Sequence, residues 1–263
     1  MTGHITSTVV DRIMTIRIDR EDKRNAIDRE MADQLRRCWE DFNSSTALVA
    51  VITGRDEAFS AGADLSGSPS GPGEGWRIHQ AVPGVLVDVE KPVISAVAGW
   101  CVGVGLYLAQ ATDLIVAAEN ARFVYPEPKI GMGGSWVPTG TAARIPLKVA
   151  MELALVCEPL SADRAYSVGM VNELVPVGHQ TERALQLARK IASHSPSAIR
   201  HIKRHVQAHG PQAQADLACN LPDRIAVLRN AEEQAEGIAA FQEGRAPDFS
   251  RFSGVGKQYD EVR

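Results

Sequence analysis

The chain has 263 residues, of which 44% are hydrophobic and 23% charged, as is usual for a globular protein. Its net charge of −4 argues against a nucleic-acid-binding protein, which would normally carry a basic surface. No apolar run reaches the length of a membrane span, and the first ten residues lack the parts of a signal peptide. We therefore expect a cytoplasmic protein that binds neither nucleic acid nor membrane.

Strands and helices alternate in the first half of the chain. Residues 7–18 predict a hairpin that turns near Asp11 and Arg12. Further strands are predicted at 48–54, 92–99 and 114–125, with a helix at 105–113. A second helix is predicted at 29–43, where apolar residues recur at helical spacing: Met31, Leu35, Cys38, Trp39 and Phe42. This alternation indicates sheets covered by helices.

The pattern becomes mainly helical from residue 159 onward. Ser195 is the predicted N-cap, and Pro196 the first residue, of a helix that runs to residue 209. The stretch at 66–75 is rich in Gly, Pro and Ser and predicts a flexible loop that can serve as a lid. The cysteines predict neither a disulfide framework nor a zinc site, because they are far apart: Cys38, Cys101, Cys157 and Cys219.

Two glycine-rich segments follow predicted strands. Residues 58–67, AFSAGADLSG, form either an ordinary turn capped by Asp64 or a bare backbone that offers N–H groups to a negative charge. Residues 97–113 repeat this plan, with Gly103 and Gly105 flanking Val104 near a helix N-terminus. Two such N–H groups aimed at one oxygen would form an oxyanion hole, in which each donor contributes about 3 kcal/mol. Close packing of strand and helix is the alternative.

Glu127 stands between Pro126 and Pro128. Proline restricts the backbone on both sides, so we expect an extended, stiff segment that holds the carboxylate in place. Such a carboxylate suits a general acid or base, which must stay within hydrogen-bond reach of the proton that it moves. The alternative is a solvated glutamate in a turn.

Two other patterns suggest different functions. His201, His205 and His209 share one helical face and form either a metal site or a solvated or subunit-facing stripe. Residues 103–108, GVGLYL, approach a dinucleotide-binding fingerprint, which would indicate an oxidoreductase. Leu108 occupies the place of its third glycine, which disfavours that interpretation.

Taken together, these segments resemble the crotonase family, the enoyl-CoA hydratases and isomerases. The resemblance is carried by KRNAIDREM at 23–31, FSAGADL at 59–65, and the segments at 98–131, 159–176 and 236–249. It implies an α/β fold in which a spiral of ββα units over residues 1–195 carries the CoA and oxyanion sites. A helical region over residues 196–263 would then build a homotrimer or hexamer.

The resemblance also implies roles for single residues. The backbone N–H groups of Ala63 and Val104 would hold the thioester oxygen of an acyl-CoA, and Glu127 would exchange a proton with its acyl chain. Coenzyme A would be part of the substrate, with no separate cofactor or metal. Phe241 would line the pocket of a neighbouring subunit, unless it is a core aromatic. The implied substrate-binding residues are Arg24, Ala26, Ala61, Gly62, Asp64, Leu65, Gly103, Pro126, Ile130 and Gly131.

Tyr107 departs from the pattern of the family's hydratases, which carry a second glutamate six residues before the position of Asp113. A phenol with a pKa of roughly 10 is a poor base at neutral pH, so a two-glutamate hydration is disfavoured. Δ3,Δ2-enoyl-CoA isomerases of the family use one glutamate at the position of Glu127. We therefore expect isomerisation or hydration of an enoyl-CoA. The alternatives are a lyase or hydrolase in which Tyr107 positions substrate or water, and a non-catalytic acyl-CoA-binding paralogue.

Overall fold

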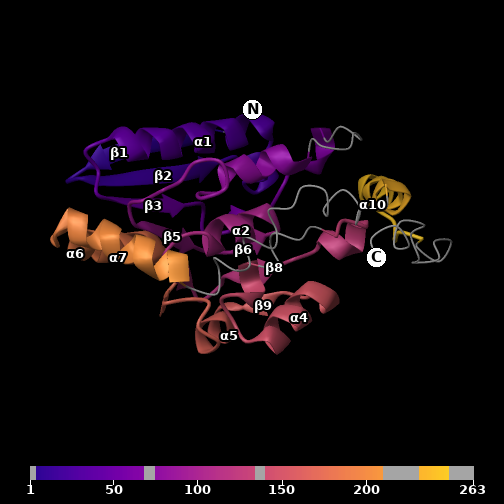
Figure 1. Ribbon diagram of the computed structural model, residues 1–263. Helices are drawn as coiled ribbons and strands as arrows, with labels where there is room; N and C mark the ends of the chain where they lie inside the picture. Colours follow the sequence, from indigo (N-terminus) through magenta and orange to yellow (C-terminus); the bar gives the residue numbers. More distant parts are fainter. Residues whose placement is uncertain (1–3, 68–74, 134–139, 210–230, 249–263) are drawn as a thin grey trace, which may run out of the picture.

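The structure is a computed structural model that describes residues 4–67, 75–133, 140–209 and 231–248 (Figure 1). Most of the loop predicted at 66–75 lies outside these residues, as does Cys219. The other three cysteines are free and buried: Cys38, Cys101 and Cys157. Within the described residues, no helix combines the length and apolar character needed to cross a membrane.

The larger sheet is mostly parallel. Only its first two strands pair antiparallel, as the predicted hairpin, and both turn residues have left-handed backbone angles, with φ of 49° at Asp11 and 63° at Arg12. In spatial order its strands are β1 (His4–Val10), β2 (Ile13–Asp19), β3 (Val49–Thr53), β5 (Val93–Val97), β7 (Leu114–Ala118) and β10 (Glu173–Val175).

A second, smaller sheet holds the short strands that follow those of the first. In spatial order they are β4 (Ala58–Ser60), β6 (Trp100–Val102), β8 (Arg122–Val124) and β9 (Leu160–Ser161). The chain passes from β3 to β4, from β5 to β6 and from β7 to β8, so each repeat adds one strand to each sheet. This regular exchange between two sheets is the expected spiral.

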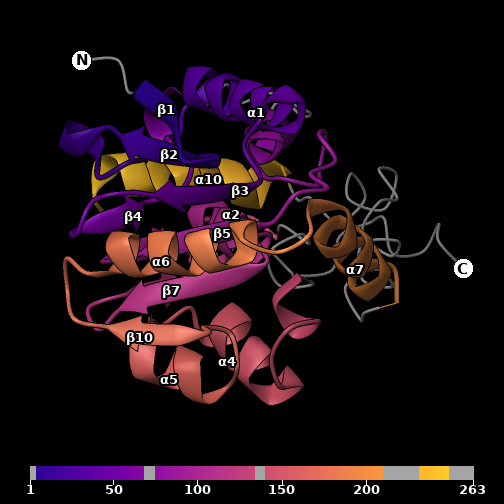
Figure 2. The same ribbon diagram turned by 90° about the vertical axis from the view of Figure 1, so that its left-hand side faces the viewer.

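Helices cover the sheets and close the core. The α-helices are α1 (Arg29–Ser44), α2 (Val104–Gln110), α4 (Leu147–Val156), α5 (Ala162–Ser167), α6 (Gln180–Ala192), α7 (Pro196–His209) and α10 (Ala231–Glu243). The 3-10 helices are η1 (Glu21–Lys23), η2 (Leu65–Gly67), η3 (Gly75–Ala81) and η4 (Glu127–Ile130). Helix α6 packs on β3, β5 and β7, and Figure 2 shows it lying across these strands.

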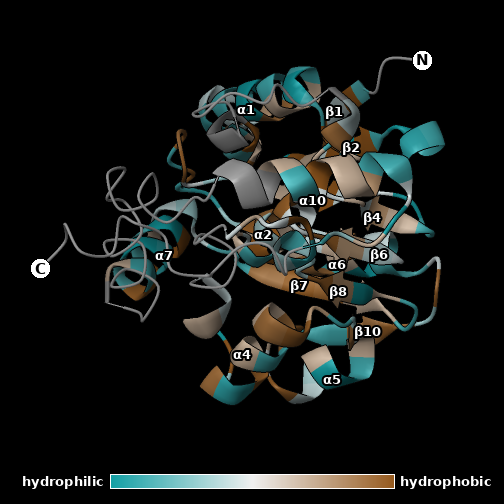
Figure 3. Cartoon of the chain, turned by 90° about the vertical axis from the view of Figure 1, so that its right-hand side faces the viewer, coloured by the Kyte–Doolittle hydropathy of each residue, from teal (hydrophilic) through white to brown (hydrophobic). Residues whose placement is uncertain are grey.

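The apolar face predicted for α1 is confirmed. All five of its apolar residues are buried, and the helix begins where the Asp28 side chain accepts the N–H of Met31. Figure 3 shows the same partition across the molecule, with hydrophobic strands such as β7 inside and hydrophilic residues on the outside of α1 and α7. The predicted cap of α7 is confirmed too, because Ser195 Oγ accepts the N–H of Ala198.

One predicted strand is wrong. Residues 114–125 do not form a single strand but split into β7 and β8, which belong to different sheets. Asn120 fixes the turn between them, since its side chain accepts the N–H of Gly99 and donates to the carbonyl of Asp56. These partners are distant in sequence, so an apolar pattern read locally does not reveal the break. The mainly helical second half also contributes a strand, β10, to the larger sheet.

Candidate active site

Main-chain hydrogen bonds tie residues 61–64 to residues 24–27. The N–H of Ala61 donates to the carbonyl of Arg24 at 3.0 Å, and the N–H of Ile27 donates to the carbonyl of Gly62 at 2.7 Å. The N–H of Asp64 returns to the carbonyl of Ile27 at 2.9 Å. The N–H of Ala63 takes no part in this pairing and has no acceptor within the described part of the chain.

The turn after β4 packs directly on the turn after β6. Gly62 has a φ of +94°, and a Cβ there would lie 3.0 Å from the carbonyl oxygen of Val102. A Cβ on Gly105 would lie 2.7 Å from the Cβ of Ser60. Glycine is therefore required at both positions for close approach, and the segments that carry Ala63 and Val104 lie next to each other.

Helix α2 presents its N-terminus at this contact. Gly103 precedes the helix with a φ of +52°, and Val104 is the first helical residue. The N–H of Val104 is one of the N-terminal donors that lack an intrahelical acceptor. Among the residues that the structure describes, no other group accepts a hydrogen bond from it either.

The carboxylate of Glu127 lies against Gly103, because a Cβ added there would overlap Glu127 Oε1. The other oxygen, Oε2, is buried and has no hydrogen-bond partner in the described part of the protein. Burial raises the pKa of Glu127 from 4.5 to about 7, although a backbone hydrogen bond acts against the rise. A carboxylate of this pKa exchanges protons readily near neutral pH.

The extended segment predicted around Glu127 is wrong. Glu127 is the first residue of the 3-10 helix η4, Pro126 is its N-cap, and the N–H of Met132 bonds back to the Glu127 carbonyl. Pro128 fits in the first turn of this helix because backbone N–H groups there need no intrahelical acceptor. The backbone still holds the glutamate in place, but as a 3-10 helical turn and not as an extended segment. Its partly buried side chain also excludes the solvated-turn alternative.

The remaining residues of this segment contact the C-terminal helix. Gly131 ends η4 with a φ of 67°, and the backbone of Ile130 is so close to Gly237 of α10 that a Cβ at Gly237 would overlap it. Phe241, on the same helix, is 61% exposed, so the core-aromatic interpretation is wrong. Its place at a neighbouring subunit stays a prediction, as do the oligomeric state and the cytoplasmic location.

Tyr107 is buried in the hydrophobic core on α2. Its ring meets the ring of His79 edge to face, with 6.0 Å between centroids. His79, on η3, was not identified from the sequence, where nothing distinguishes it from other histidines. Tyr107 is therefore held in one orientation at the position where the family's hydratases have a glutamate.

Asp64 has a structural role. Its side chain accepts the N–H of Ser66 at 2.9 Å and forms an ion pair with Arg20 at 2.7 Å. Burial acts to raise the pKa of Asp64, but the hydrogen bonds from Ser66 and the charge of Arg20 hold it below its ordinary value. The two interpretations of this segment are thus compatible, since Asp64 caps the turn while the N–H of Ala63 has no acceptor among the described residues. Sequence analysis missed Arg20, which binds Asp28 as well as Asp64.

The other predicted residues lie around this core of the site. Arg24 is exposed and has a left-handed φ of 49°, Ala26 is half-buried beside it, and Leu65 begins η2. The histidine stripe lies elsewhere, on α7, where the rings of His201 and His205 are 4.4 Å apart. The side chain of His209 lies outside the described residues, and no group of three potential metal ligands occurs among the side chains that are described.

Residues 9–251 match the sequence pattern of the family described as enoyl-CoA hydratase/isomerase. The chain belongs to this family. It is 33% identical to a 2,3-dehydroadipyl-CoA hydratase of Escherichia coli (strain K12), over 90% of this chain and 95% of that protein. Its fold is similar to that of a carnitinyl-CoA hydratase from Mycobacterium avium, with a TM-score of 0.80 at 32% identity, covering 92% of this chain and 97% of the other.

A more distant structure shares the fold alone. A methylmalonyl-CoA decarboxylase in complex with 2-nitronate-propionyl-CoA superimposes with a TM-score of 0.81 at 24% identity, covering 93% of this chain and 97% of the other. Family membership therefore supports an acyl-CoA substrate for the protein. The reaction has to be argued from the residues of the site.

Proposed function

We propose that the protein moves the double bond of an enoyl-CoA thioester, with Glu127 as its sole carboxylate acid and base. The observation that carries this proposal is the environment of Glu127. Its carboxylate is buried beside the N-terminus of α2, one oxygen has no partner among the described residues, and its pKa is raised to about 7. A buried carboxylate oxygen without a hydrogen-bond partner destabilises the fold, and a catalytic role would account for its presence.

The N–H groups of Ala63 and Val104 would hold the thioester oxygen. They belong to adjacent segments, and neither has an acceptor within the described residues. Removal of a proton from C2 of the acyl chain would place negative charge on this oxygen. Two preorganised donors, one at a helix N-terminus, would stabilise the enolate more than the neutral thioester, by about 3 kcal/mol for each donor.

Glu127 would act first as a base and then as an acid. In its ionised form it takes a proton from C2, and the enolate electrons shift so that the double bond moves into conjugation. The protonated carboxyl group then returns a proton to C4. A pKa of about 7 suits both steps, because the group gains and loses a proton at little cost near neutral pH.

Hydration is the second candidate, favoured by the relative named 2,3-dehydroadipyl-CoA hydratase. Hydration needs a water that is deprotonated while a carbon atom is protonated. Tyr107 is buried against His79 and core side chains at the position of the hydratases' second glutamate. Without a second carboxylate, Glu127 would have to serve both steps, so we expect isomerisation to be faster than hydration.

The test compares a 3-enoyl-CoA with crotonyl-CoA as substrates for the purified protein and for Glu127→Gln. We expect isomerisation to exceed hydration, and the variant to lose about 10²-fold or more of the activity. For the wild-type protein, kcat/KM should rise with pH up to about 7 and then level off, because the base must be ionised. Equal rates for wild type and variant would remove Glu127 from the mechanism, and faster hydration would favour the second candidate.

A further inference from the structure

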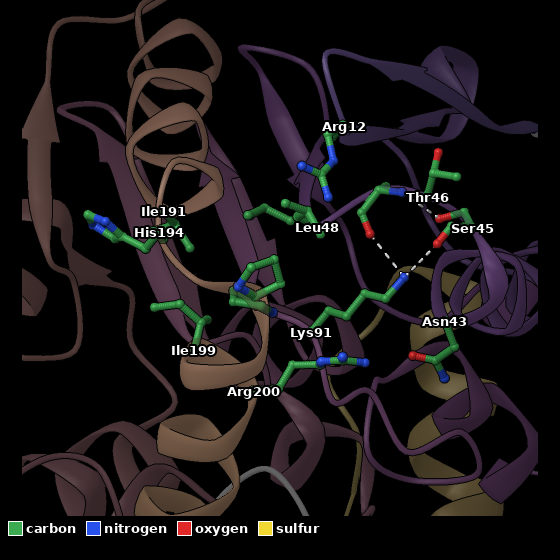
Figure 4. A pocket seen from close by; sticks show the side chains of 14 residues that line it. Arg12, Asn43, Ser45, Thr46, Leu48, Lys91, Ile191, His194, Ile199 and Arg200 are labelled. Atoms are coloured by element: carbon green, nitrogen blue, oxygen red, sulfur yellow. Dashed lines mark hydrogen bonds between the residues drawn. The ribbon is translucent and has the colours of Figure 1, made fainter.

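A groove of about 400 Å³ lies outside the candidate active site. It is formed where β3 and β5 begin, where α1 ends, and where α6 gives way to α7 (Figure 4). None of the residues proposed for acyl-CoA chemistry lines it. The groove therefore needs an explanation of its own.

Positive charge dominates the groove. Arg12, Lys91 and Arg200 line it, and none of its described lining residues is acidic. Figure 4 shows the three cationic side chains at the same opening, with Lys91 between the two arginines. The charge of Arg200 even contributes, after burial, to lowering the pKa of Lys91. The like charges thus lie close enough to repel one another.

Lys91 has partners for its charge. Its ammonium group donates to the carbonyls of Phe42, Ser45 and Ala47 at 2.7, 2.9 and 2.9 Å. These carbonyls belong to the end of α1 and the residues just after it, where the helix dipole is negative. Lys91 therefore uses all three of its donors within the protein, on carbonyls at the negative end of α1 and just after it.

The two arginines have no such partners. Within the described residues, neither Arg12 nor Arg200 has an ion pair or a side-chain hydrogen bond, and both side chains are exposed to solvent. On the same helix as Arg200 the other cations are paired, Lys203 with Asp113 at 2.8 Å and Arg204 with Glu90. Both arginines that line the groove are thus without an ion pair or side-chain hydrogen bond among the described residues.

We propose that this groove binds a phosphate monoester. Two guanidinium groups supply two positive charges and planar donor pairs, which match a phosphate of charge close to −2 at neutral pH. A carboxylate would compensate only one of them. The first turn of α7 also lies in the wall and adds the positive end of a 14-residue helix. Leu48, Ile191 and Ile199 line the groove as well and would contact the organic part of the ligand.

The test is calorimetric titration of the full-length protein, in a phosphate-free buffer of low ionic strength, with phenyl phosphate, inorganic phosphate and benzoate. We expect phenyl phosphate to bind at least tenfold more tightly than benzoate, and inorganic phosphate to bind with an affinity between theirs. The double variant Arg12→Gln/Arg200→Gln should weaken binding of phenyl phosphate at least tenfold. The matched control Arg37→Gln removes an exposed arginine of α1 that does not line this groove. It should change the affinity for phenyl phosphate less than twofold.

Repeating the titration with excess dephospho-coenzyme A, which lacks the 3′-phosphate monoester of coenzyme A, separates this groove from the proposed active site. Binding of phenyl phosphate should persist, because none of the residues proposed to bind coenzyme A lines the groove. Competition by dephospho-coenzyme A, equal binding of benzoate, or unchanged binding by a double variant that melts at the wild-type temperature would each overturn the proposal. None of these outcomes depends on whether the enzyme isomerises or hydrates its substrate.

Discussion

Lys91 and Glu127 are two buried charged groups that the protein treats in opposite ways. Lys91 is 8% exposed, donates to three carbonyls, and lies over the Phe42 ring at 5.0 Å. Glu127 has a buried oxygen without a partner in the described part of the chain, and its pKa is raised to about 7. All three donors of the lysine have acceptors within the protein, whereas one oxygen of the glutamate has no donor among the described residues.

The contrast is between a structural charge and a charge that we propose to be catalytic. A buried charge with all its hydrogen bonds holds two elements together, here the end of α1 and the start of β5. A buried charge without them costs stability and persists where it is used in a reaction. Variants at the two sites should therefore have opposite effects on stability and activity.

The largest expected effect is on stability at the lysine. Lys91→Met removes the ammonium donor from the carbonyls of Phe42, Ser45 and Ala47, and we expect the free energy of unfolding to fall by about 3 kcal/mol. Chemical denaturation measures this loss. Lys23→Met, which removes an exposed lysine of η1, is the control and should change stability by less than about 0.5 kcal/mol. A Lys91 variant as stable as the control would mean that these bonds do not matter.

A substitution at Glu127 should have the opposite effect and raise the free energy of unfolding. Because the folded-state pKa of about 7 exceeds the unfolded value of 4.5, the folded protein binds more protons between these values and loses stability as pH rises through them. Glu127→Gln removes this loss, so we expect the variant to be about 3 kcal/mol more stable than wild type at pH 8 and equally stable near pH 4.

Denaturation at both pH values measures the difference. Glu119→Gln, at an exposed position, is the control and should show no such dependence on pH. A glutamine variant that is less stable at pH 8 would show that the carboxylate makes favourable contacts, and the contrast with Lys91 would then fail.

The smallest expected effect tests whether Gly103 sets the position of Glu127. In Gly103→Ala the new methyl group would overlap Glu127 Oε1, and we expect kcat to fall roughly tenfold as the carboxylate shifts. The φ of +52° also costs about 1 kcal/mol of stability for a residue with a Cβ.

A matched control isolates the catalytic part of this effect. Gly84 has a φ of +86° and no atom within 4 Å of its added Cβ, so Gly84→Ala carries the backbone strain without the contact. It should lose similar stability and keep its kcat. Equal kcat values for the two variants would show that Gly103 does not position the carboxylate.

Some features of the site depend on local rules and were predicted from the sequence. The glycine-rich turns after two strands, a helix that begins near Val104 and the N-cap Ser195 depend on a few neighbouring residues. The resemblance added the family and the importance of Glu127. The family is now shown, while the roles of Ala63 and Val104 stay proposals.

Other features depend on residues far apart in the chain. The break between β7 and β8 is fixed by the bonds of Asn120 to Gly99 and Asp56, and the unpaired state of Arg12 and Arg200 follows from which acids lie nearby in space. The sequence contains these residues but does not indicate their partners.

The sequence by itself predicted most strands of the larger sheet and the helices α1 and α7, the two glycine-rich turns, and Glu127 as the candidate acid and base. Backbone geometry and hydrophobic spacing act over a few residues, so they can be read locally. Only the tertiary structure decided that Lys91 is satisfied and Glu127 is not, because burial and hydrogen-bond partners come from packing between distant segments. Burial and hydrogen bonding together set the free energy of a charge inside a protein.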